Sequence, residues 1–138
     1  MNQLVALESE VIEQVQPDTL FLPYREDVPS DHAVVFDAAS VCCKSFRCPC
    51  VKNVYAYETL SETDFGIKPS GDCFKPNLFV DGTGWLEKNI EAMGIYQGEM
   101  REFLFPRSEV SIRALASLRG GQAGVEAAES FMVLKEIL

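Results

Sequence analysis

The chain has 138 residues, of which 47% are hydrophobic, and this length suits one domain with a buried core. Its 12 basic residues are outnumbered by 21 acidic ones, and the net charge of -9 argues against binding to nucleic acid or to an anionic membrane surface. No apolar run approaches the ~18 residues that span a bilayer, and the N-terminus lacks the pattern of a signal peptide. We therefore expect a single cytoplasmic domain over residues 1–138.

Helix and strand patterns alternate in the first half of the chain. Residues 4–15 carry apolar side chains at helical spacing, and residues 19–22 form a short apolar run typical of a strand buried on both faces. Ser30 is a candidate N-cap for a second helix over residues 30–43. Residues 51–59 are rich in Val and Tyr and predict a second strand.

The alternation continues after a loop that contains turn-forming residues, namely Gly66, Pro69, Ser70 and Gly71. Residues 75–81 predict a third strand, and a helix is expected to begin at Thr83 or Gly84 and to continue through Tyr96. Together these elements predict an α/β layer fold.

The last segment predicts one clear helix and one ambiguous stretch. Ser108 is the expected N-cap of a helix that ends at Gly120-Gly121. Residues 124–130 have a small-residue helical pattern, whereas residues 131–134 fit either a continued helix or a last strand.

Five cysteines, four of them crowded between Cys42 and Cys50, raise the question of a metal or disulfide framework. A structural zinc site usually shows two separated cysteine pairs, and the cluster has no second half except the isolated Cys73. Reduced, partly buried thiols are the favoured interpretation, with Cys42 and Cys43 packed at the end of a helix.

Several short motifs follow one another in a single order through the chain. One of them is Lys75-Pro76-Asn77-Leu78-Phe79-Val80-Asp81, and the others lie at residues 57–66, 86–97, 100–101, 105–108, 119–120 and 124–131. In order and spacing they resemble the C-terminal part of the LmbE-like (PIG-L) family of zinc-dependent N-acetyl-sugar deacetylases. The resemblance implies a Rossmann-like three-layer α/β fold, truncated relative to the full family domain, because the family's N-terminal His-Pro-Asp-Asp segment has no counterpart in this chain.

The resemblance also suggests site residues. Pro29-Ser30-Asp31-His32 stands where the family has its second metal-binding segment, so His32 matches the third zinc ligand and Asp31 matches the catalytic carboxylate beside it. Pro29 departs from the family pattern, which has His or Asn there. The two remaining zinc ligands belong to the absent segment, and zinc is therefore expected only if the site is complete.

An ordinary role remains open for each matched residue. His32 also fits a helix-start histidine with Asp31 as its charge partner, although Glu26 and Asp27 could place further oxygens near a metal.

Two more residues are candidate contacts for a substrate. Glu58 follows a strand and could line a substrate cleft, or it is a solvated carboxylate. Arg107 could contact a sugar or a carboxylate, or its charge is balanced by Glu102 or Glu109.

Four other polar or aromatic residues fit structural roles better than catalytic ones. Asn77 and Asp81 are expected to form strand and turn hydrogen bonds. Trp85 and Tyr96 are expected to be core or interface anchors.

Two functions from different classes remain open. The first is a zinc-dependent hydrolase that removes acetyl from N-acetylglucosamine-type amino sugars or conjugates. The alternative is a non-catalytic α/β module that lost the metal site and acts by self-association or partner binding. Because a truncated sheet exposes a strand edge and an apolar face, we expect a homo-oligomer.

Overall fold

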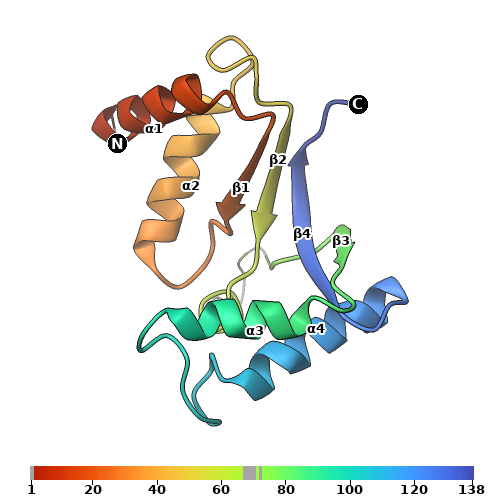
Figure 1. Cartoon of the computed structure of the whole chain (residues 1–138). Coiled ribbons are helices and arrows are strands. Elements are labelled where there is room, and N and C mark those ends of the chain that lie inside the picture. The colour runs from red at the N-terminus through yellow and green to blue at the C-terminus, as the bar shows by residue number, and fades with distance from the viewer. Residues whose placement is uncertain (1, 67–70, 72) are drawn as a thin grey trace. The chain divides into compact units, whose positions relative to one another are not determined.

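The computed structural model describes residues 2–66, 71 and 73–138 (Figure 1). Within them the elements follow in the order α1 (Asn2–Val15), β1 (Thr19–Pro23), α2 (Ser30–Cys42), β2 (Asn53–Tyr57), β3 (Leu78–Asp81), α3 (Leu86–Ile95), α4 (Glu109–Ala123) and β4 (Ala128–Lys135). The strands form a mixed sheet in the order β1-β2-β4-β3, which confirms the predicted α/β class. Pro69 and Ser70 of the predicted loop lie outside the described residues.

Contacts between residues divide the chain into two compact units. Unit 1 comprises Met1–Asn77 and Phe131–Leu138, and unit 2 comprises Leu78–Ser130. Strand β4 therefore begins in unit 2 and continues in unit 1. That residues 1–138 form a single domain stays a prediction.

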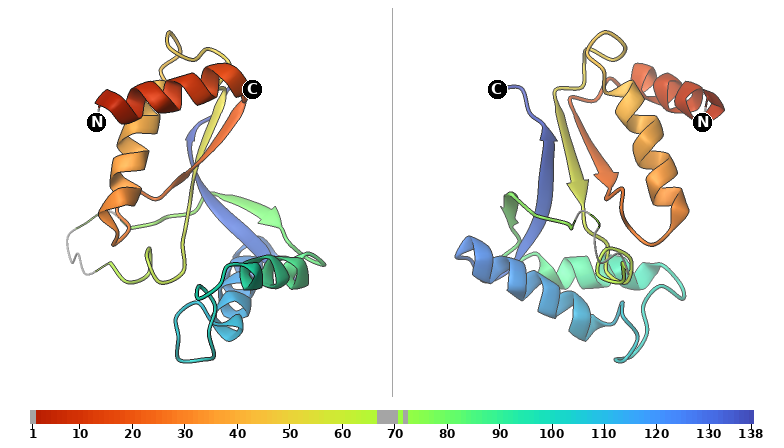
Figure 2. Two further views of the ribbon diagram at one scale, coloured as in Figure 1. Left: turned by 60° about the vertical axis from the view of Figure 1, so that its left-hand side comes forward. Right: turned by 180° about the vertical axis from the view of Figure 1, so that it is seen from behind.

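Unit 1 is built on a strand-helix-strand crossover. Strands β1 and β2 are parallel, with Thr19 opposite Asn53 and Pro23 opposite Tyr57, and α2 connects them. On its other side β2 pairs antiparallel with β4, with Tyr57 opposite Phe131. Helix α1 packs on α2, and α2 packs on β1, so both helices lie toward the same side of the strands (Figure 2).

The core of unit 1 lies between its helices and its strands. It consists of buried apolar side chains, namely Ile12, Leu22, Ala39, Cys42, Cys48, Val51 and Val54. The prediction that β1 is buried on both faces is wrong, because Phe21 is 54% exposed and Leu22 only 5%. Successive side chains of a strand point to opposite faces, and α1 and α2 cover the face that carries Leu22. The Phe21 ring instead contacts the rings of Tyr55 and Phe131, with centroids 5.6 and 5.2 Å apart.

Helix α2 begins where the sequence predicts, but its cap differs. Pro29 occupies the N-cap position and provides no side-chain hydrogen bond, while Ser30 is already the first helical residue. Proline suits this position because its backbone lacks an N–H and its φ of -70° is fixed by the ring. At the other end the Cys43 N–H donates to the Ala39 carbonyl at 2.9 Å.

Unit 2 contains α4, whose N-terminus is predicted correctly and whose C-terminus is not. The Ser108 side chain caps the helix by accepting from the Ser111 N–H at 3.2 Å. The helix continues through Gly120-Gly121 and ends at Gly124, whose φ of +77° is the left-handed conformation that glycine adopts most readily. The predicted helical character of residues 124–130 is also wrong, because β4 begins at Ala128.

Helix α3 begins later than the sequence predicts. Its first residue is Leu86, because Thr83 takes part in a turn in which its N–H donates to Asp81 Oδ1 at 2.9 Å. The expected turn role of Asp81 is thereby confirmed. Asn77 likewise has its expected strand role, since its Oδ1 accepts from the Val133 N–H at 2.8 Å.

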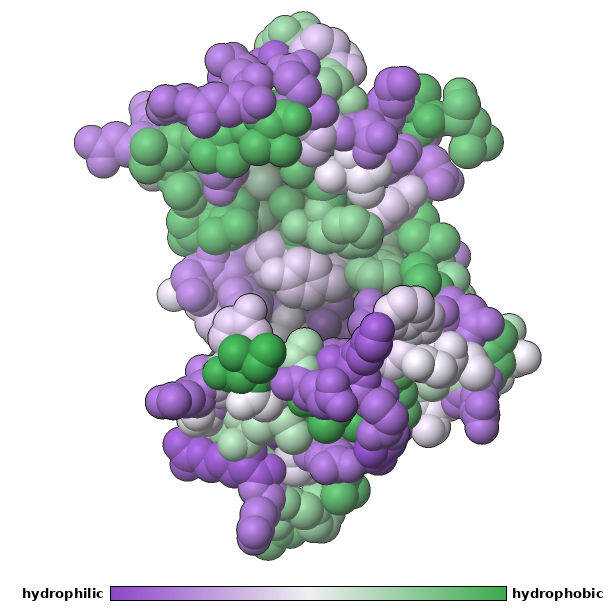
Figure 3. Space-filling view, viewed as in Figure 1, coloured by the Kyte–Doolittle hydropathy of each residue, from purple (hydrophilic) through white to green (hydrophobic). Residues whose placement is uncertain are grey.

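One face of the molecule shows how apolar and polar side chains are distributed over the helices. On the face shown in Figure 3, apolar side chains gather beside α1 and α2, whereas polar and apolar side chains are mixed over α3 and α4. Trp85 and Tyr96 are not core residues, since they are 62% and 66% exposed. Among the described residues no helix has the length and apolar character needed to cross a bilayer.

Candidate functional site

The parallel strands β1 and β2 end at the same edge of the sheet, and the loops that follow them are joined there. The Tyr24 N–H donates to the Tyr57 carbonyl at 3.1 Å, and the Val28 N–H donates to the Glu62 carbonyl at 3.3 Å. In α/β folds the carboxyl edge of the strands is where ligands bind. Side chains from these two loops are therefore the first candidates for a functional site.

A buried carboxylate connects the two loops, and we call Asp27, His32 and Thr63 the Asp27 cluster. Asp27 is 4% exposed. Its Oδ2 lies 2.7 Å from His32 Nδ1, and its Oδ1 accepts from Thr63 Oγ1 at 2.6 Å. Asp27 follows β1, Thr63 follows β2, and His32 lies in the first turn of α2, so three segments converge on one carboxyl group.

The hydrogen bonds of the Asp27 cluster indicate which groups donate and which accept. Thr63 Oγ1 accepts from the Thr59 N–H at 2.8 Å, so its own hydrogen is directed to Asp27. An ionised carboxylate can only accept, and beside an ionised Asp27 the His32 ring donates from Nδ1. In the neutral ring this leaves Nε2 with a free lone pair, which can take up a proton or bind a metal ion.

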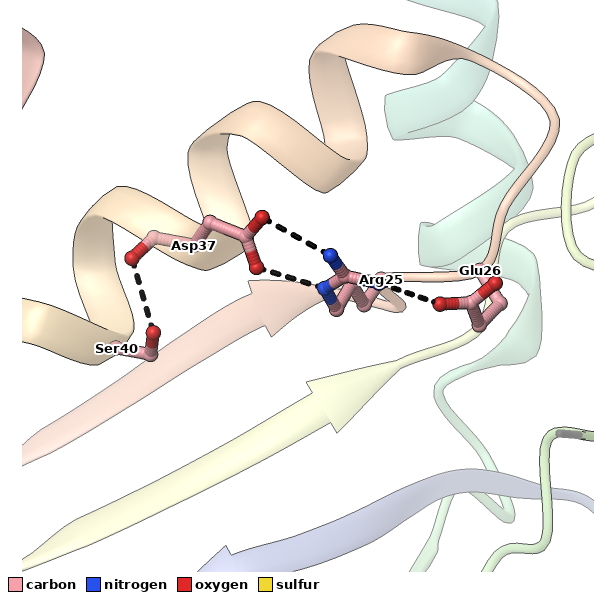
Figure 4. Close-up of polar contacts among 4 residues, drawn as sticks. All are labelled: Arg25, Glu26, Asp37 and Ser40. Carbon is pink, nitrogen blue, oxygen red and sulfur yellow. Dashed lines mark hydrogen bonds and ion pairs between the residues drawn. The ribbon is translucent and has the colours of Figure 1, made fainter. Parts of the chain in front are cut away.

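An ion pair holds the loop after β1 against α2 (Figure 4). Arg25 Nε donates to Asp37 Oδ1 at 2.7 Å and Nη2 donates to Asp37 Oδ2 at 3.1 Å, while Nη1 donates to Glu26 Oε1 at 2.7 Å. The hydrogen bond from Arg25 lowers the pKa of Asp37, which keeps the pair charged over the neutral range. A fork-shaped contact of this kind fixes geometry as well as charge. It therefore helps to hold Asp27, two residues further on, near His32.

Tyr57 ends β2 beside the same edge. Burial raises the pKa of the Tyr57 phenol, and the negative charge of Asp27 raises it further by a smaller amount. The phenol therefore keeps its proton at neutral pH and remains a potential hydrogen-bond donor.

The predicted site residues fall in different surroundings. Asp31 is exposed, and its Oδ1 accepts from the backbone N–H of His32 at 3.1 Å, whereas the ring of His32 is paired with Asp27. The expectation that Asp31 is the charge partner of His32 is therefore wrong for the ring. Glu58 is half-buried and directly follows β2, in the same unit as the Asp27 cluster.

Arg107 belongs to unit 2 and has a partner other than those expected. Its Nη1 lies 2.5 Å from Glu99 Oε2, in place of an oxygen of Glu102 or Glu109. Its Nε is buried and has no hydrogen-bond partner in the described part of the chain. The proposed substrate roles of Glu58 and Arg107 stay predictions, as do those of Asp31 and His32 in catalysis and metal binding.

A complete metal site is not assembled by the described residues. Within residues 2–66, 71 and 73–138 no group of three or more His, Cys, Asp or Glu side chains could hold a metal ion. All five cysteines are free, and burial raises the pKa of Cys43 to about 11, which disfavours the thiolate that binds metals. A catalytic zinc site usually needs three protein ligands. The described residues offer one, the imidazole of His32 held by Asp27, and do not supply the other two.

Sequence reasoning underestimated Asp27 and missed Thr63. The signal for Asp27 was its position between a buried strand and a helix start, where a carboxylate can reach a histidine in the first helical turn. Thr63 gave no comparable signal, because its contact with Asp27 spans 36 residues and depends on the pairing of β1 with β2.

Comparison with known proteins supports the fold. No protein-family model and no curated protein sequence matches the chain. A conserved protein of Thermus thermophilus has a similar structure, with a TM-score of 0.77 and 17% identity over 100% of this chain and 61% of that one. The N,N'-diacetylchitobiose deacetylase of Pyrococcus horikoshii, solved with an inhibitor, has a TM-score of 0.68 and 15% identity over 98% of this chain and 52% of that one.

The chain thus spans about half to three-fifths of the length of these two solved structures. At such low identity the likeness concerns the fold, and it confirms the Rossmann-like α/β architecture predicted from the sequence. Membership of the LmbE-like family stays a prediction, with a deacetylase among the proteins that share the fold.

Proposed function

We propose that the chain contributes part of the active site of a deacetylase-like hydrolase, centred on His32 and Asp27. The single observation that carries the proposal is the 2.7 Å contact between His32 Nδ1 and a buried Asp27 carboxylate at the carboxyl edge of two parallel strands. The fold shared with a diacetylchitobiose deacetylase supports the same class of reaction. N-acetyl amino sugars or similar conjugates are the proposed substrates.

The geometry suits a proton-transfer or ligand role for His32. Hydrolysis of an N-acetyl group requires a water to lose a proton and the leaving amine to gain one. Nε2 of His32 can accept such a proton, and the buried Asp27 carboxylate would stabilise the positive charge that then forms on the ring. The same hydrogen bond would orient the ring if Nε2 instead binds a metal.

Zinc is the proposed metal for this activity. When bound, it would lower the pKa of a water molecule and supply the nucleophile near neutral pH. His32 is the residue that would bind it, and the remaining ligands must come from outside the described residues.

Zinc analysis and an amide-hydrolysis assay test this proposal on the full chain. We expect zinc to be retained only weakly, because one imidazole cannot hold it tightly. Any release of amine from N,N'-diacetylchitobiose with added zinc should be abolished in His32→Ala and reduced roughly 10- to 100-fold in Asp27→Asn. Asp64→Asn is a matched control, since Asp64 is exposed in the loop beside Thr63. Turnover that survives unchanged in His32→Ala would contradict the proposal.

The second candidate is a module that acts by self-association, and an apolar groove in unit 1 favours it. The groove has a volume of about 290 Å³ and lies between α1, β1 and α2. Leu7 and Val11 line it and are 61% and 57% exposed, and β1 is an edge strand of the sheet. Glu8 also lines it, with Oε2 buried and without a partner among the described residues, and burial raises the pKa of Glu8. A second copy of the chain could cover this surface.

Sedimentation velocity over a range of concentrations tests the self-association. We expect a dimer that Val11→Glu dissociates, because the substitution places a charge in the apolar groove. Val110→Glu is the matched control, since Val110 has a similar exposure of 54% but lies in unit 2. A monomer at all concentrations would rule this candidate out.

A further inference from the structure

A second cavity lies entirely within unit 2 and uses none of the residues of the Asp27 cluster. It has a volume of about 310 Å³, and the residues that line it include Asp81, Trp85, Asn89, Ala127, Ala128 and Glu129. A volume of this size is at the lower end of the range for small-molecule sites. Hence the cavity could hold a compact ligand.

Backbone hydrogen bonds fix the backbone of Trp85, which is one of the residues that line this cavity. The Gly82 N–H donates to the Ala127 carbonyl at 2.9 Å, which joins the end of β3 to the segment before β4. The Trp85 N–H donates to the Gly82 carbonyl at 2.9 Å, so a tight turn presents the side chain. Although its backbone is fixed, Trp85 is 62% exposed. A large aromatic ring held at an open cavity is a feature typical of a binding site.

The polar groups around the cavity favour a cation. Hydrogen bonds from Thr83 lower the pKa of Asp81, so this carboxylate is charged at neutral pH. Glu129 Oε1 accepts from Asn89 Nδ2 at 3.4 Å, a long bond that a ligand could readily replace. Two acidic residues and one amide residue, from β3, β4 and α3, are therefore among the residues that line the cavity.

The Trp85 ring already contacts one cation. The Lys88 ammonium nitrogen lies 4.8 Å from the centroid of the ring, within the range of a cation–π interaction. Lys88 follows Trp85 by three residues in the chain, so the contact is local. It indicates that the face of this ring attracts a positive charge even though the side chain is exposed.

We propose that the cavity beside Trp85 binds a small organic ammonium compound, with an amino sugar that carries a free amine as the ligand class. The ammonium group of the sugar would pair with the carboxylates of Asp81 and Glu129, and the amide of Asn89 would hydrogen-bond a hydroxyl of the sugar. The indole of Trp85 would cover the apolar face of the sugar ring. The choice of an amino sugar, which is the product of N-deacetylation, rests on the proposed function, whereas the preference for a cation rests on the cavity alone.

Fluorescence of the full chain gives a direct test, because Trp85 is the one tryptophan in the sequence. Glucosamine, N-acetylglucosamine and glucose share a ring and differ at one substituent, so titration with each at about pH 6 separates charge from shape. We expect a saturable change with glucosamine and a much weaker response to the two neutral sugars. The shift of the single indole N–H signal in NMR spectra should follow the same order. Equal responses to all three sugars, or no saturable response to glucosamine, would overturn the proposal.

Variants that keep Trp85 test the assigned contacts. Glu129→Gln and Asp81→Asn preserve the local hydrogen bonds but remove one charge each, and each should weaken glucosamine binding roughly two- to fivefold. Glu91→Gln removes an exposed carboxylate of α3 outside the cavity lining and should leave binding unchanged. Lys88→Gln removes the competing ammonium and should tighten binding. Unchanged glucosamine affinity in both cavity variants would contradict the assignment.

These experiments are independent of hydrolysis. Glucosamine binding at Trp85 can be found even if His32 proves unimportant for amide cleavage. Conversely, loss of turnover in His32→Ala can occur in a protein whose Trp85 cavity binds nothing. The two proposals can therefore fail separately.

Discussion

The two units are stabilised in different ways. Unit 1 buries a cluster of apolar side chains contributed by α1, β1, α2 and β2, and the Asp27 cluster is built at the edge of those strands. In unit 2 the buried side chains are mostly small, with Ile112 the largest among them, and specific local contacts join the elements. Among these contacts are two ion pairs of Arg113, whose Nη1 lies 2.6 Å from Glu87 Oε1 and whose Nη2 lies 2.8 Å from Glu109 Oε1. We infer that unit 1 depends on apolar burial, whereas unit 2 depends more on the cap of α4 and on close backbone packing, with a small contribution from its exposed ion pairs.

The largest effect should come from the core of unit 1. Leu22→Ala removes a side chain that is 5% exposed and should lower the free energy of unfolding by roughly 2–5 kcal/mol. Leu118→Ala in α4 is the control, because a side chain that is 57% exposed should cost about 0.5 kcal/mol or less. Urea denaturation followed by circular dichroism measures both. Equal losses would contradict the assigned core.

Two adjacent glycines of α4 should respond in opposite directions. A Cβ at Gly120 would lie 2.7 Å from the Val125 carbonyl oxygen and 2.8 Å from that of Glu126, so Gly120→Ala should destabilise the protein by roughly 1–3 kcal/mol. A Cβ at Gly121 meets nothing within 4 Å, and Gly121→Ala should stabilise the helix by about 0.5–1 kcal/mol. Thermal unfolding of the two variants compares them directly. A stabilising Gly120→Ala would show that α4 does not pack closely on the segment that follows it.

The cap of α4 should contribute a smaller amount. Ser108 is 1% exposed and accepts from the Ser111 N–H, so Ser108→Ala should cost about 1 kcal/mol. Ser117→Ala lies on the exposed surface of the same helix and should change stability little. Denaturant unfolding of both variants gives the comparison, and a loss of the same size in both would show that the cap is not specific.

A separate effect, confined to alkaline pH, is a loss of stability there. Burial raises the pKa of Cys43 to about 11 from 9.0, so the folded state binds this proton more tightly than the unfolded chain. The resulting stabilisation is complete below about pH 9 and disappears as the pH rises through 11. Cys43→Ala should make the unfolding free energy less sensitive to pH in this window, whereas Cys73→Ala should not, because Cys73 is exposed. Parallel pH profiles in all three proteins would contradict this account.

Much of the fold could be predicted because local patterns agree with the final packing. Apolar spacing located α1, and Ser108 located the start of α4, since a serine cap acts within one helical turn. The end of α4 could not be predicted from composition. Gly120, Gly121 and Gly124 are all candidates in the sequence, and the left-handed φ at Gly124 is set by how the chain turns into β4.

The candidate site was predictable only in part. The position of His32 at a helix start followed from the sequence, but the partner of its ring did not. Asp27 and Asp31 are both close to His32 in sequence, and which of them bonds the ring depends on the direction in which the loop after β1 returns to α2. The ion pair between Arg25 and Asp37 holds that loop. The contact of Thr63 with Asp27 requires the pairing of two strands distant in sequence, which periodicity does not reveal.

The tautomer of His32 tests the central claim most directly, because the chain contains one histidine and its ring nitrogens can be assigned without ambiguity. Long-range ¹H–¹⁵N correlation spectra of the full chain, recorded while the ring is neutral, show which nitrogen carries the hydrogen. The account predicts that Nδ1 is protonated and Nε2 is not in the native protein, and that Asp27→Asn weakens this preference while the control Asp64→Asn preserves it. A native protein with the hydrogen on Nε2 would contradict the proposed role of Asp27 in presenting His32 for catalysis or metal binding.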